Sequence, residues 1–468
     1  MTPPLSVDVA VIGGGPAGMA AASAATGLGC RVGLVDSYPL LGGQVHRQAW
    51  RRLGAGQDPV AGLPRRFRGL GADPGVRLHL GSSVWHARQV TGGFELLLTT
   101  GESVHAGAVV LATGAVELVL PFPGWDLPGA MTPGAAQALL KGQGRLAGRR
   151  VVVAGSGPFL LPVAAGLVRA GATVVAVAEA SRLRPGVLGR PGVWRGLSSS
   201  PAKLAEGAGY LSALLRRRVP LLAGWAVTAC RGRSQVEEVR LSRLAPDWAG
   251  WDRERWVRAD TCCVGYGFVP SMELARALGC GERPRRGLPG SAVVVGPDQS
   301  TSTGGVFAAG EVCGISGAAA AELEGLLAGR AAACWVGKRG GRPGPPTASV
   351  RRRLARQRSF AVALEQLGRI GAGWTAWLED ETPVCRCEET TWAKVRQAVG
   401  AGARDLRGVR GLTRAGMGYC QGRVCGPALA LAVAGLAGRG LAEVGDLATR
   451  SIAWPVPLGT IAHSAGPG

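Results

Sequence analysis

The chain has 468 residues, enough for two to four domains around a large buried core. Its 53 Lys and Arg against 31 Asp and Glu give a formal charge of +22, a balance that can indicate nucleic-acid binding. Nearly all of this positive charge comes from arginines that are spread along a glycine-rich chain, so a biased composition explains it better, and we expect no nucleic-acid partner.

The N-terminal residues lack the basic segment and long apolar run of a signal peptide. The apolar stretch 151–180 is long enough to span a membrane, but Gly155, Gly157, Pro158 and Arg169 interrupt it and it has a βαβ rhythm. We therefore expect a buried domain core there and no transmembrane segment. The expected location is cytoplasmic, with peripheral contact to the inner face of the membrane as an alternative.

The first predicted unit is a βαβ unit at residues 8–36. Its turn carries G-x-G-x-x-G at Gly13, Gly15 and Gly18. The first glycine permits a tight turn, the second lets the backbone approach a pyrophosphate, and the third lets helix and strand pack closely. The helix N-terminus favours phosphates, and Asp36 at the end of the second strand can accept hydrogen bonds from ribose hydroxyls. These features predict a dinucleotide site.

Two segments after this unit indicate a flavin. The Gly43-Gln44 loop follows at the place where flavoproteins with two dinucleotide-binding domains bring the backbone close to the cofactor. Residues 51–81 are read as irregular, and short antiparallel strands are expected at 84–88, 94–99 and 103–104. A buried strand then ends in Ala112-Thr113-Gly114, a segment that passes beside the cofactor in such flavoproteins.

A second βαβ unit begins near residue 150, with Gly155 and Gly157 in its turn and Glu179 at the end of its second strand. Leu160 occupies the third glycine position, where its side chain would obstruct close packing or force a wider turn. An acid at the strand end favours an unphosphorylated ribose. The unit therefore predicts either a site for NAD or another nucleotide, or a retained fold with an altered or empty pocket.

Two features follow this unit. Residues 182–201 are rich in Gly, Pro and Ser and are expected to form a basic loop. The adjacent Cys262 and Cys263 lie on a predicted buried strand and should point to its opposite faces, so we expect them to pack in the core rather than to carry chemistry.

The chain then returns to the flavin domain at Gly310-Glu311, which end a predicted strand before a helix at 318–335. The acid can bind the ribityl chain, and the helix start can support negative charge on a reduced flavin. A Gly/Pro/Arg linker at 337–346 and a short helical piece at 350–368 are expected to lead to the last domain.

Four cysteines stand near the end of the chain, as Cys385-x-Cys387 and Cys420-x4-Cys425. Thiolates suit iron–sulfur clusters or zinc, but zinc knuckles are mostly C-x2-C. We favour a [2Fe–2S] cluster, with zinc and unligated thiols as alternatives. Glycines around the second pair can turn N–H groups toward sulfur, and nearby arginines can offset the cluster's charge. These are Gly416, Gly418, Gly422, Gly426, Arg386, Arg414 and Arg423.

Taken together, these motifs resemble one family, the FAD- and iron–sulfur-carrying subunits of heteromeric amino-acid and opine dehydrogenases. That family includes subunits of opine oxidases, dye-linked proline or hydroxyproline dehydrogenases and hydrogen cyanide synthase. The most specific segments are 112–115, 122–125, 155–158, 314–325, 384–388, 420–427 and 454–458. The cysteine region resembles the bacterioferritin-associated-ferredoxin-like (BFD-like) domain, although that family more often has C-x2-C in its second pair.

The resemblance implies an α/β fold with two dinucleotide-binding domains, as in two-domain flavoprotein disulfide reductases, and a small α-rich C-terminal [2Fe–2S] domain. The expected parts are an FAD domain at 1–120 and 271–336, an NAD(P)-type domain at 121–270, a linker and helical segment at 337–380, and a BFD-like domain at 381–468. The residues expected to bind FAD or a second nucleotide are Gly13, Gly15, Pro16, Ala17, Gly18, Asp36, Gly43, Gln44, Val84, Ala112, Thr113, Gly114, Gly310, Glu311, Ala318, Gly155, Gly157 and Glu179. The expected cluster ligands are the cysteines at 385, 387, 420 and 425.

The resemblance also implies a division of labour. A separate flavin-containing subunit, similar to D-amino-acid oxidase, is expected to oxidise the C–N bond, while this chain passes electrons through FAD and cluster to an acceptor. A small ferredoxin-like subunit is a further candidate partner. The sequence lacks the redox cysteine pairs of disulfide and thioredoxin reductases, so no catalytic side chain is expected. A stand-alone NAD(P)H-dependent reductase and a redox-sensing or scaffold protein remain alternatives.

Overall fold

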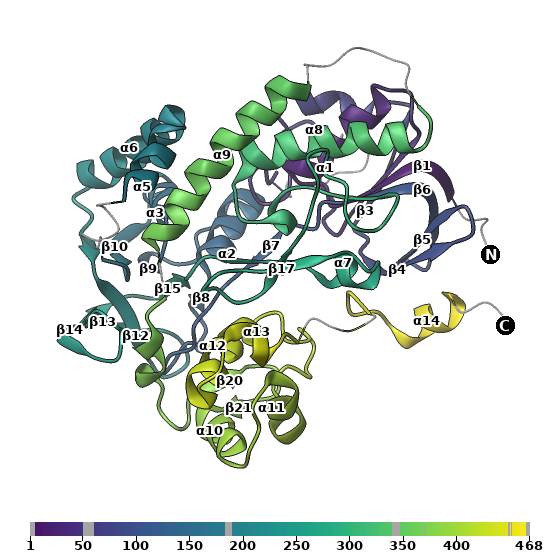
Figure 1. Ribbon diagram of the computed structural model, residues 1–468. Helices are drawn as coiled ribbons and strands as arrows, with labels where there is room; N and C mark the ends of the chain where they lie inside the picture. The colour runs from purple at the N-terminus through teal and green to yellow at the C-terminus, as the bar shows by residue number, and fades with distance from the viewer. Residues whose placement is uncertain are drawn as a thin grey trace.

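The computed structural model describes residues 5–49, 60–182, 190–338, 347–368, 370–447, 450 and 452–464. Figure 1 shows two sheet-centred domains with a smaller helix-rich domain packed beneath them. This arrangement confirms the predicted α/β fold class with an α-rich C-terminal domain.

The first domain is built on a seven-stranded sheet of order β3-β2-β1-β6-β5-β4, with β19 paired to β6. Strands β3, β2, β1, β6 and β19 are parallel, whereas β4 and β5 are antiparallel. Parallel neighbours bring the carboxyl ends of β1, β6 and β19 to one edge, where α/β proteins bind ligands. The elements are β1 (Leu5–Ile12), α1 (Pro16–Thr26), β2 (Val32–Asp36), η2 (Arg65–Gly71), β3 (Val76–Leu80), β4 (Val84–Val90), β5 (Gly93–Leu98), β6 (Ser103–Leu111), β7 (Ala115–Glu117), α7 (Glu273–Ala277), β17 (Glu282–Pro284), β18 (Ser291–Val293), β19 (Val306–Ala308), η4 (Glu311–Cys313) and α8 (Ala318–Trp335).

Helices α1 and α8 cover one face of this sheet, and α7 packs against the other. Small residues let α1 and α8 touch backbone to backbone, because a Cβ added to Gly325 would lie 2.0 Å from the carbonyl oxygen of Ala17. The N-terminal residues of the chain and the segment around 310 therefore form one domain, although almost 300 residues separate them in the sequence.

The second domain has a parallel sheet of order β11-β10-β9-β15-β8 and a separate antiparallel sheet β12-β13-β14. Cys262 and Cys263 lie on β15, both buried, and belong to cores on opposite faces of the sheet, as predicted. The elements are β8 (Ala130–Met131), α2 (Pro133–Ala138), η3 (Leu139–Gln143), β9 (Arg150–Gly155), α3 (Leu160–Arg169), β10 (Thr173–Glu179), α5 (Pro191–Ser198), α6 (Pro201–Arg216), β11 (Leu221–Ala223), β12 (Trp225–Arg231), β13 (Glu238–Leu244), β14 (Trp251–Arg258), β15 (Thr261–Gly265) and β16 (Phe268–Pro270).

Three expectations about local structure were wrong. The stretch 51–81, read as irregular, contains η2 and β3, and β3 pairs with the edge of the first sheet; residues 51–59 lie outside the described part. The strand expected at 103–104 is the start of the longer β6. The loop expected from residue 182 to 201 contains α5, which begins at a proline, a favoured first residue of a helix; residues 183–189 are not described.

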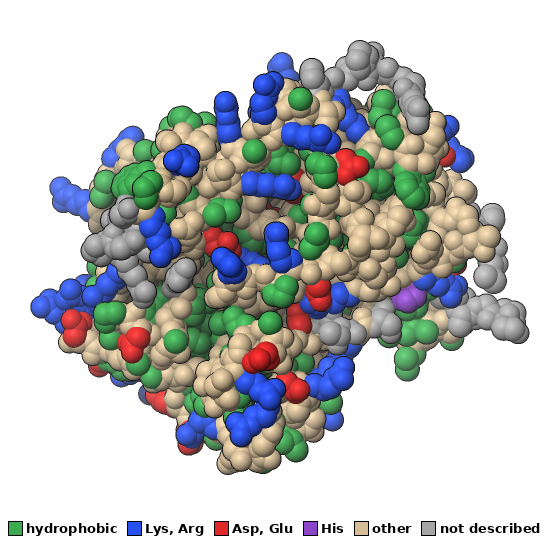
Figure 2. Space-filling model, viewed as in Figure 1, with side chains coloured by type: hydrophobic (Ala, Val, Ile, Leu, Met, Phe, Trp, Pro, Cys, Tyr) green, Lys and Arg blue, Asp and Glu red, His purple; other side chains and the backbone are tan. Residues whose placement is uncertain are grey.

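The linker expected at 337–346 lies mostly outside the described residues. The helical piece after it is longer than expected: α9 (Thr347–Leu367) has 21 residues. In Figure 1 it runs from α8 toward the second domain, and Figure 2 shows blue basic side chains along it. Helix α9 therefore links both larger domains before the chain enters the C-terminal domain.

The C-terminal domain shares its core with the second domain. The rings of Trp248 and Trp377 stack with centroids 5.8 Å apart, and Trp125 Nε1 donates to the carbonyl oxygen of Pro383 at 2.6 Å. The last segment returns to the first domain, where Ala453 N–H donates to the Trp85 carbonyl at 2.7 Å (Figure 1). The elements are η5 (Ala372–Trp377), β20 (Pro383–Cys385), β21 (Thr390–Thr391), α10 (Trp392–Gly400), α11 (Leu406–Thr413), α12 (Cys425–Ala437), α13 (Leu441–Val444) and α14 (Leu458–Ser464).

Candidate functional site

The first glycine turn connects β1 to α1 and leaves no room for side chains. Gly13 has φ +109°, and a Cβ there would lie 2.2 Å from the Ala112 carbonyl oxygen. A Cβ on Gly18 would lie 1.7 Å from the Gly13 carbonyl oxygen. The turn is therefore held tightly between the start of α1 and the end of β6.

This turn offers hydrogen-bond donors to a ligand. Within the described part of the chain, the N–H groups of Gly15, Ala17 and Gly18 have no acceptor, and Pro16 begins α1 without an N–H. The 11-residue helix adds its positive dipole end to these donors. A cradle of free N–H groups at a helix start fits a pyrophosphate, which is the central group of FAD.

Asp36 lies beside this cradle, and its carboxylate already accepts two backbone N–H groups. Its Oδ2 accepts the Gly14 N–H at 2.5 Å and its Oδ1 accepts the Tyr38 N–H at 2.7 Å. Burial raises the pKa of this carboxyl, although both amides oppose the rise. Each carboxylate oxygen still has a lone pair available, so ribose contacts can be added to this arrangement.

Arg47 is a residue that the sequence reading missed. Its guanidinium lies over the Tyr38 ring, 4.2 Å from the centroid, and close enough to Asp36 to interact electrostatically. Among the described residues, its Nε and one terminal nitrogen are buried without an acceptor. A partly exposed cation with two buried, unused donor nitrogens fits an anionic or acceptor-rich ligand at this edge. In the sequence, only the nearby Gly42-Gly43 pair pointed to this segment.

The Gly43-Gln44 loop and Val84 flank the same cradle. Gly42 N–H donates to the Gly14 carbonyl at 2.9 Å, and a Cβ on Gly43 would lie 2.9 Å from the Gly15 Cα. Gln44 itself is exposed. The buried Val84 opens β4 two residues after Ser82, whose N–H donates to the Asp36 carbonyl.

The Ala112-Thr113-Gly114 segment follows the next strand end. Ala112 N–H donates to the Ile12 carbonyl at 2.8 Å, which continues the β1–β6 pairing into the turn. The Thr113 hydroxyl donates to the Ser271 carbonyl at 2.9 Å, and Ser271 N–H returns a bond to the Gly114 carbonyl. This segment is thereby fixed to the chain that precedes α7.

Gly310 and Glu311 complete the edge. Gly310 packs against α1, because a Cβ there would lie 2.9 Å from the Ala17 Cβ. Glu311 Oε1 accepts the Gly317 N–H at 2.8 Å, one residue before Ala318 begins α8. Burial raises the pKa of Glu311 to about 7. The structure therefore brings predicted FAD residues together from the ends of four strands, β1, β2, β6 and β19.

A buried ion pair behind this turn was also missed. Glu324 on α8 is only 2% exposed; its Oε2 accepts the Gly310 N–H at 2.8 Å and its Oε1 pairs with Arg358 of α9 at 2.7 Å. Arg358 also donates to Gln299, and Gln299 donates to the Ala308 carbonyl. Helix α9 is thus tied to the turn that carries Glu311.

The second glycine turn is different, because two of its N–H groups already bond to the protein. Gly157 N–H donates to Glu179 Oε2 at 2.8 Å, and Ser156 N–H donates to the Gly265 carbonyl at 2.9 Å. Burial raises the pKa of Glu179, whose other oxygen accepts the Ser181 N–H. Helix α3 starts five residues after Gly155, so the turn is wider, which was one of the two expectations for Leu160.

The end of α9 also lies over this second turn. A Cβ on Gly368 would lie 3.1 Å from Ser156 Oγ and 4.0 Å from the Gly157 nitrogen. Glu365, one turn earlier, pairs with Arg285 at 2.6 Å. The backbone of this segment therefore stands where a pyrophosphate would approach the turn.

The four cysteines of the C-terminal domain are brought together. The Cys425 thiol contacts the sulfurs of Cys385 and Cys420, and Cys420 also contacts Cys387. Because the Cys425 thiol donates to them, the pKa of Cys385 falls to about 6 and that of Cys420 to about 4, while that of Cys425 rises. In the described residues no three His, Cys, Asp or Glu surround one point as a single metal ion requires.

Backbone amides face these sulfurs, as the glycine pattern predicted. Gly416 N–H donates to Cys385 Sγ at 3.5 Å, and the amides of Gly422 and Val424 favour the thiolate of Cys420. Close thiolates that accept N–H bonds fit a [2Fe–2S] cluster, whose two iron atoms share the four cysteines, better than they fit one zinc ion.

The three arginines near the cysteines have different roles. Arg386 stacks on Trp125 at 4.0 Å, and Arg414 pairs with Glu388 at 2.9 Å. Arg423 donates to the Cys420 carbonyl at 3.2 Å and pairs with Glu273 of α7 at 2.8 Å. Arg423 is therefore the one of these three that joins the cysteine loop to the first domain.

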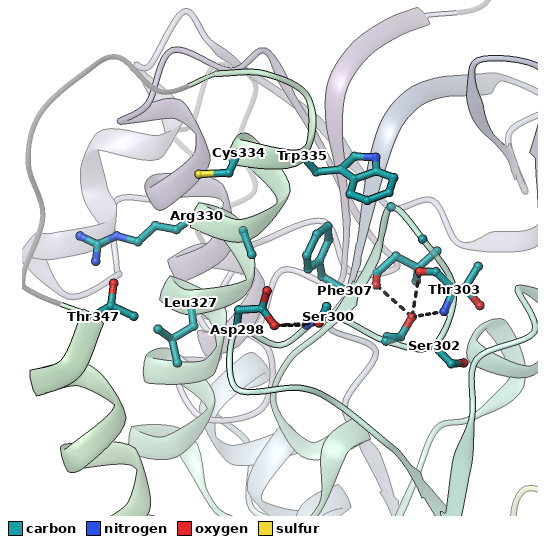
Figure 3. Close-up of a pocket in the computed structure, with 15 residues that line it drawn as sticks. Asp298, Ser300, Ser302, Thr303, Phe307, Leu327, Arg330, Cys334, Trp335 and Thr347 are labelled. Atoms are coloured by element: carbon teal, nitrogen blue, oxygen red, sulfur yellow. Dashed lines mark hydrogen bonds between the residues drawn. The ribbon is translucent and has the colours of Figure 1, made fainter.

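A cavity of about 630 Å³ lies away from these groups. Figure 3 shows it between the strand segment around Phe307 and the ends of α8 and α9, with Arg330, Cys334 and Trp335 at its border. It includes the residues that enter β19, whereas Gly310 follows the opposite end of that strand. It is thus at the far edge of the sheet from the cradle.

Comparisons with known proteins agree with this geometry. Residues 7–191 match the pyridine nucleotide-disulphide oxidoreductase family and residues 383–433 match the BFD-like [2Fe-2S] binding domain. An opine oxidase subunit from Agrobacterium tumefaciens is 34% identical, over 97% of this chain and 91% of that protein. The HcnB subunit of hydrogen cyanide synthase from Pseudomonas aeruginosa is 31% identical, over 89% and 90%.

Solved structures agree on the fold. L-proline dehydrogenase from P. horikoshii superposes with a TM-score of 0.68 over 98% of this chain and 80% of that chain, at 21% identity. Thioredoxin reductase of T. acidophilum matches 70% of this chain and 98% of its own, with a TM-score of 0.50 and 22% identity. Among the described residues, no helix is long and apolar enough to cross a membrane.

Proposed function

Since the chain belongs to the same family as these subunits of opine oxidase and hydrogen cyanide synthase, we propose that it is the electron-transfer subunit of a heteromeric amino-acid or amine dehydrogenase of proline, hydroxyproline or opine type. Its partner is a second flavin-containing subunit, similar to D-amino-acid oxidase, that oxidises the C–N bond. A small ferredoxin-like subunit is a further candidate member of the complex.

The family membership makes the chain an FAD-dependent oxidoreductase subunit with a [2Fe–2S] cluster. Bound FAD accepts an electron pair, and the cluster passes single electrons. In our proposal the free N–H groups of Gly15, Ala17 and Gly18 hold the pyrophosphate, and Asp36 holds the ribose. Glu311 holds the ribityl chain, and the start of α8 supports negative charge near the flavin ring.

The observation that carries the electron-relay proposal is the connection between the two cofactor regions. Thr113 bonds to Ser271, and two residues later Glu273 forms a mostly buried ion pair with Arg423, between Cys420 and Cys425. A second pair joins Arg276 of α7 to Asp446 at 3.0 Å. Two ion pairs from α7 across the contact support a fixed distance between flavin and cluster, which electron transfer needs.

The side chains contribute binding and orientation in this proposal, and none acts as an acid or base on a substrate. No cysteine pair stands at the redox positions of disulfide or thioredoxin reductases. The amine substrate would bind to the partner subunit, so the residues of this chain would set the route and rate of electrons.

A stand-alone NAD(P)H-dependent reductase is the second candidate, favoured by the retained β9–α3–β10 unit with Glu179. The consumed donors of Ser156 and Gly157 and the position of Gly368 over the turn count against it. A turn whose serine and second-glycine N–H groups are already bonded has fewer donors for a pyrophosphate.

The test is to purify the chain alone and together with a co-expressed flavin-containing subunit similar to D-amino-acid oxidase. Alone, it should hold FAD, iron and acid-labile sulfide, and it should oxidise neither proline, hydroxyproline nor an opine. With the partner, the amine should bleach its flavin and drive reduction of a dye. Amine oxidation by the chain alone would overturn the proposal, and rapid bleaching by NADH would favour the reductase.

A further inference from the structure

The C-terminal domain exposes large apolar side chains around its cysteines. Tyr419 is 80% exposed, and both Met417 and Val424 are exposed as well. All three lie within four residues of Cys420 in the chain, and we name these three side chains the cluster face. Large apolar groups gathered on one surface mark contact sites between proteins.

The cluster face lies directly over the outer cysteine. Cys387 is exposed, whereas Cys385 and Cys425 are buried. The loop that carries Met417 and Tyr419 touches it, because a Cβ on Gly418, the residue between them, would lie 2.2 Å from the Cys387 Cβ. The outer thiol is therefore the one nearest to a protein that docks on this surface.

The opposite side of the cysteine group is already covered. Arg423 and Gly422 face the segment 270–273 of the first domain, with the ion pair between Arg423 and Glu273 at their centre. Electrons from the flavin would thus reach the cysteine group on its covered side and leave it through the cluster face. The two sides are chemically distinct, since the first is a fixed internal contact and the second is open.

Cations border the cluster face. Arg407 and Arg410 lie one turn apart on α11, Arg414 follows as the residue that caps its C-terminal end, and Arg450 lies within electrostatic range of Arg410. Arg414 is paired with Glu388, but its side chain remains 69% exposed. A positive border around an apolar centre is complementary to an acidic protein surface, and such charges raise association rates.

We propose that the cluster face binds an acidic one-electron carrier protein and passes electrons to it. One electron would leave the reduced cluster for the oxidised carrier, with no bond broken and no proton transferred. This inference rests on the proposed electron-transfer function and adds the surface through which electrons leave the protein. A flavin subunit that delivers electron pairs is matched to the FAD, whereas the one-electron cluster is matched to a one-electron acceptor.

The probe is cytochrome b5, a small acidic one-electron acceptor, with the basic cytochrome c as its counterpart. Reduced holoprotein is mixed with each in stopped flow at low and high salt, and the affinity of the oxidised proteins is measured by calorimetry. We expect the rate with cytochrome b5 to fall about 10-fold or more as salt rises, and to exceed that with cytochrome c at low salt.

Tyr419→Ser and Arg407→Glu should each lower both the affinity for cytochrome b5 and the rate about 10-fold. Leu215→Ser on α6 and Arg352→Glu on α9 are matched controls, exposed but remote, and should change neither. The visible absorbance of the [2Fe–2S] cluster and the rate of ferricyanide reduction should stay at the wild-type level in all four variants.

The outcomes separate the two proposals. If the holoprotein reduces ferricyanide but cytochrome b5 binds equally to wild type and to the cluster-face variants, the docking inference is wrong. If only Arg352→Glu weakens binding, the carrier docks on α9 instead and the inference is again wrong. If the purified chain holds no cluster, or its cluster is not reduced through the flavin, the proposed function itself fails.

Discussion

The ion pair between Glu324 and Arg358 gives the sharpest test of how α9 supports the flavin site. Arg358→Met keeps an unbranched apolar stem but removes the guanidinium, its charge and its bonds to Glu324 and Gln299. Glu324 would then be a buried carboxylate whose remaining partner is the Gly310 N–H. We expect both the stability of the fold and its hold on FAD to decrease.

The size of the effect follows from burial. Removing one partner of a fully buried ion pair costs about 3–5 kcal/mol. Arg358 is 41% exposed and Glu324 can take up a proton, so we expect about 2 kcal/mol near pH 8. Burial already raises the pKa of Glu324, and loss of the cation raises it further. The folded variant then binds a proton that the unfolded chain lacks, so the loss is smaller at pH 6 than at pH 8.

Urea unfolding and flavin-fluorescence release of FAD, each at pH 6 and pH 8, measure these effects. Arg352→Met, an exposed arginine on the same helix, is the matched control, and Glu324→Gln combined with Arg358→Met should recover most of the loss, because Gln can still accept the Gly310 N–H. Equal behaviour of Arg358→Met and Arg352→Met at both pH values would refute the reasoning.

Three further changes test other parts of the site. Gly325→Ala should destabilise the fold by about 1–3 kcal/mol, because its Cβ would meet the Ala17 carbonyl. Gly207→Ala on α6, with open space around it, should stabilise the fold by about 0.5–1 kcal/mol, and thermal unfolding of both variants measures these changes. Glu311→Gln should flatten the stability of the FAD-free chain between pH 4.5 and 7, where the wild type loses about 3 kcal/mol because its folded pKa is raised; an unchanged slope in urea unfolding would speak against this. Cys425→Ser should remove iron and sulfide but leave FAD bound, and a variant that keeps its iron content would show that Cys425 is not a ligand.

The sequence predicted those parts of the site that depend on local rules. The glycines at 13 and 18 were identifiable because a turn between a strand and a helix needs them at that spacing, and the helix 318–335 followed from a run rich in alanine and other small residues. By contrast, Glu324 lies inside that run and pairs with Arg358, 34 residues later. Spacing along the chain carries no information about such a pair, since it forms only when α9 packs against α8.

Long-range packing also explains the misread secondary structure. Strand β3 was assigned to an irregular stretch because its five residues include Arg and His, yet pairing with β2 makes it the edge of the first sheet. Helix α9 was underestimated because its arginines obscure the buried positions of Val350, Leu354 and Phe360. In both cases the neighbour that stabilises the element is distant in the sequence.

The two glycine turns show how one motif reaches two outcomes. Asp36 has the shorter side chain and accepts the N–H of Gly14, the middle residue of its turn, so the Gly15 N–H stays free. Glu179, one methylene longer, reaches the third residue, and Gly157 loses its free donor. Because a carboxylate in this position already supplies the negative charge that a phosphate would bring, the second unit is satisfied by its own side chain. The motif alone specifies a turn, and the length of the acid opposite it decides whether donors remain for a cofactor.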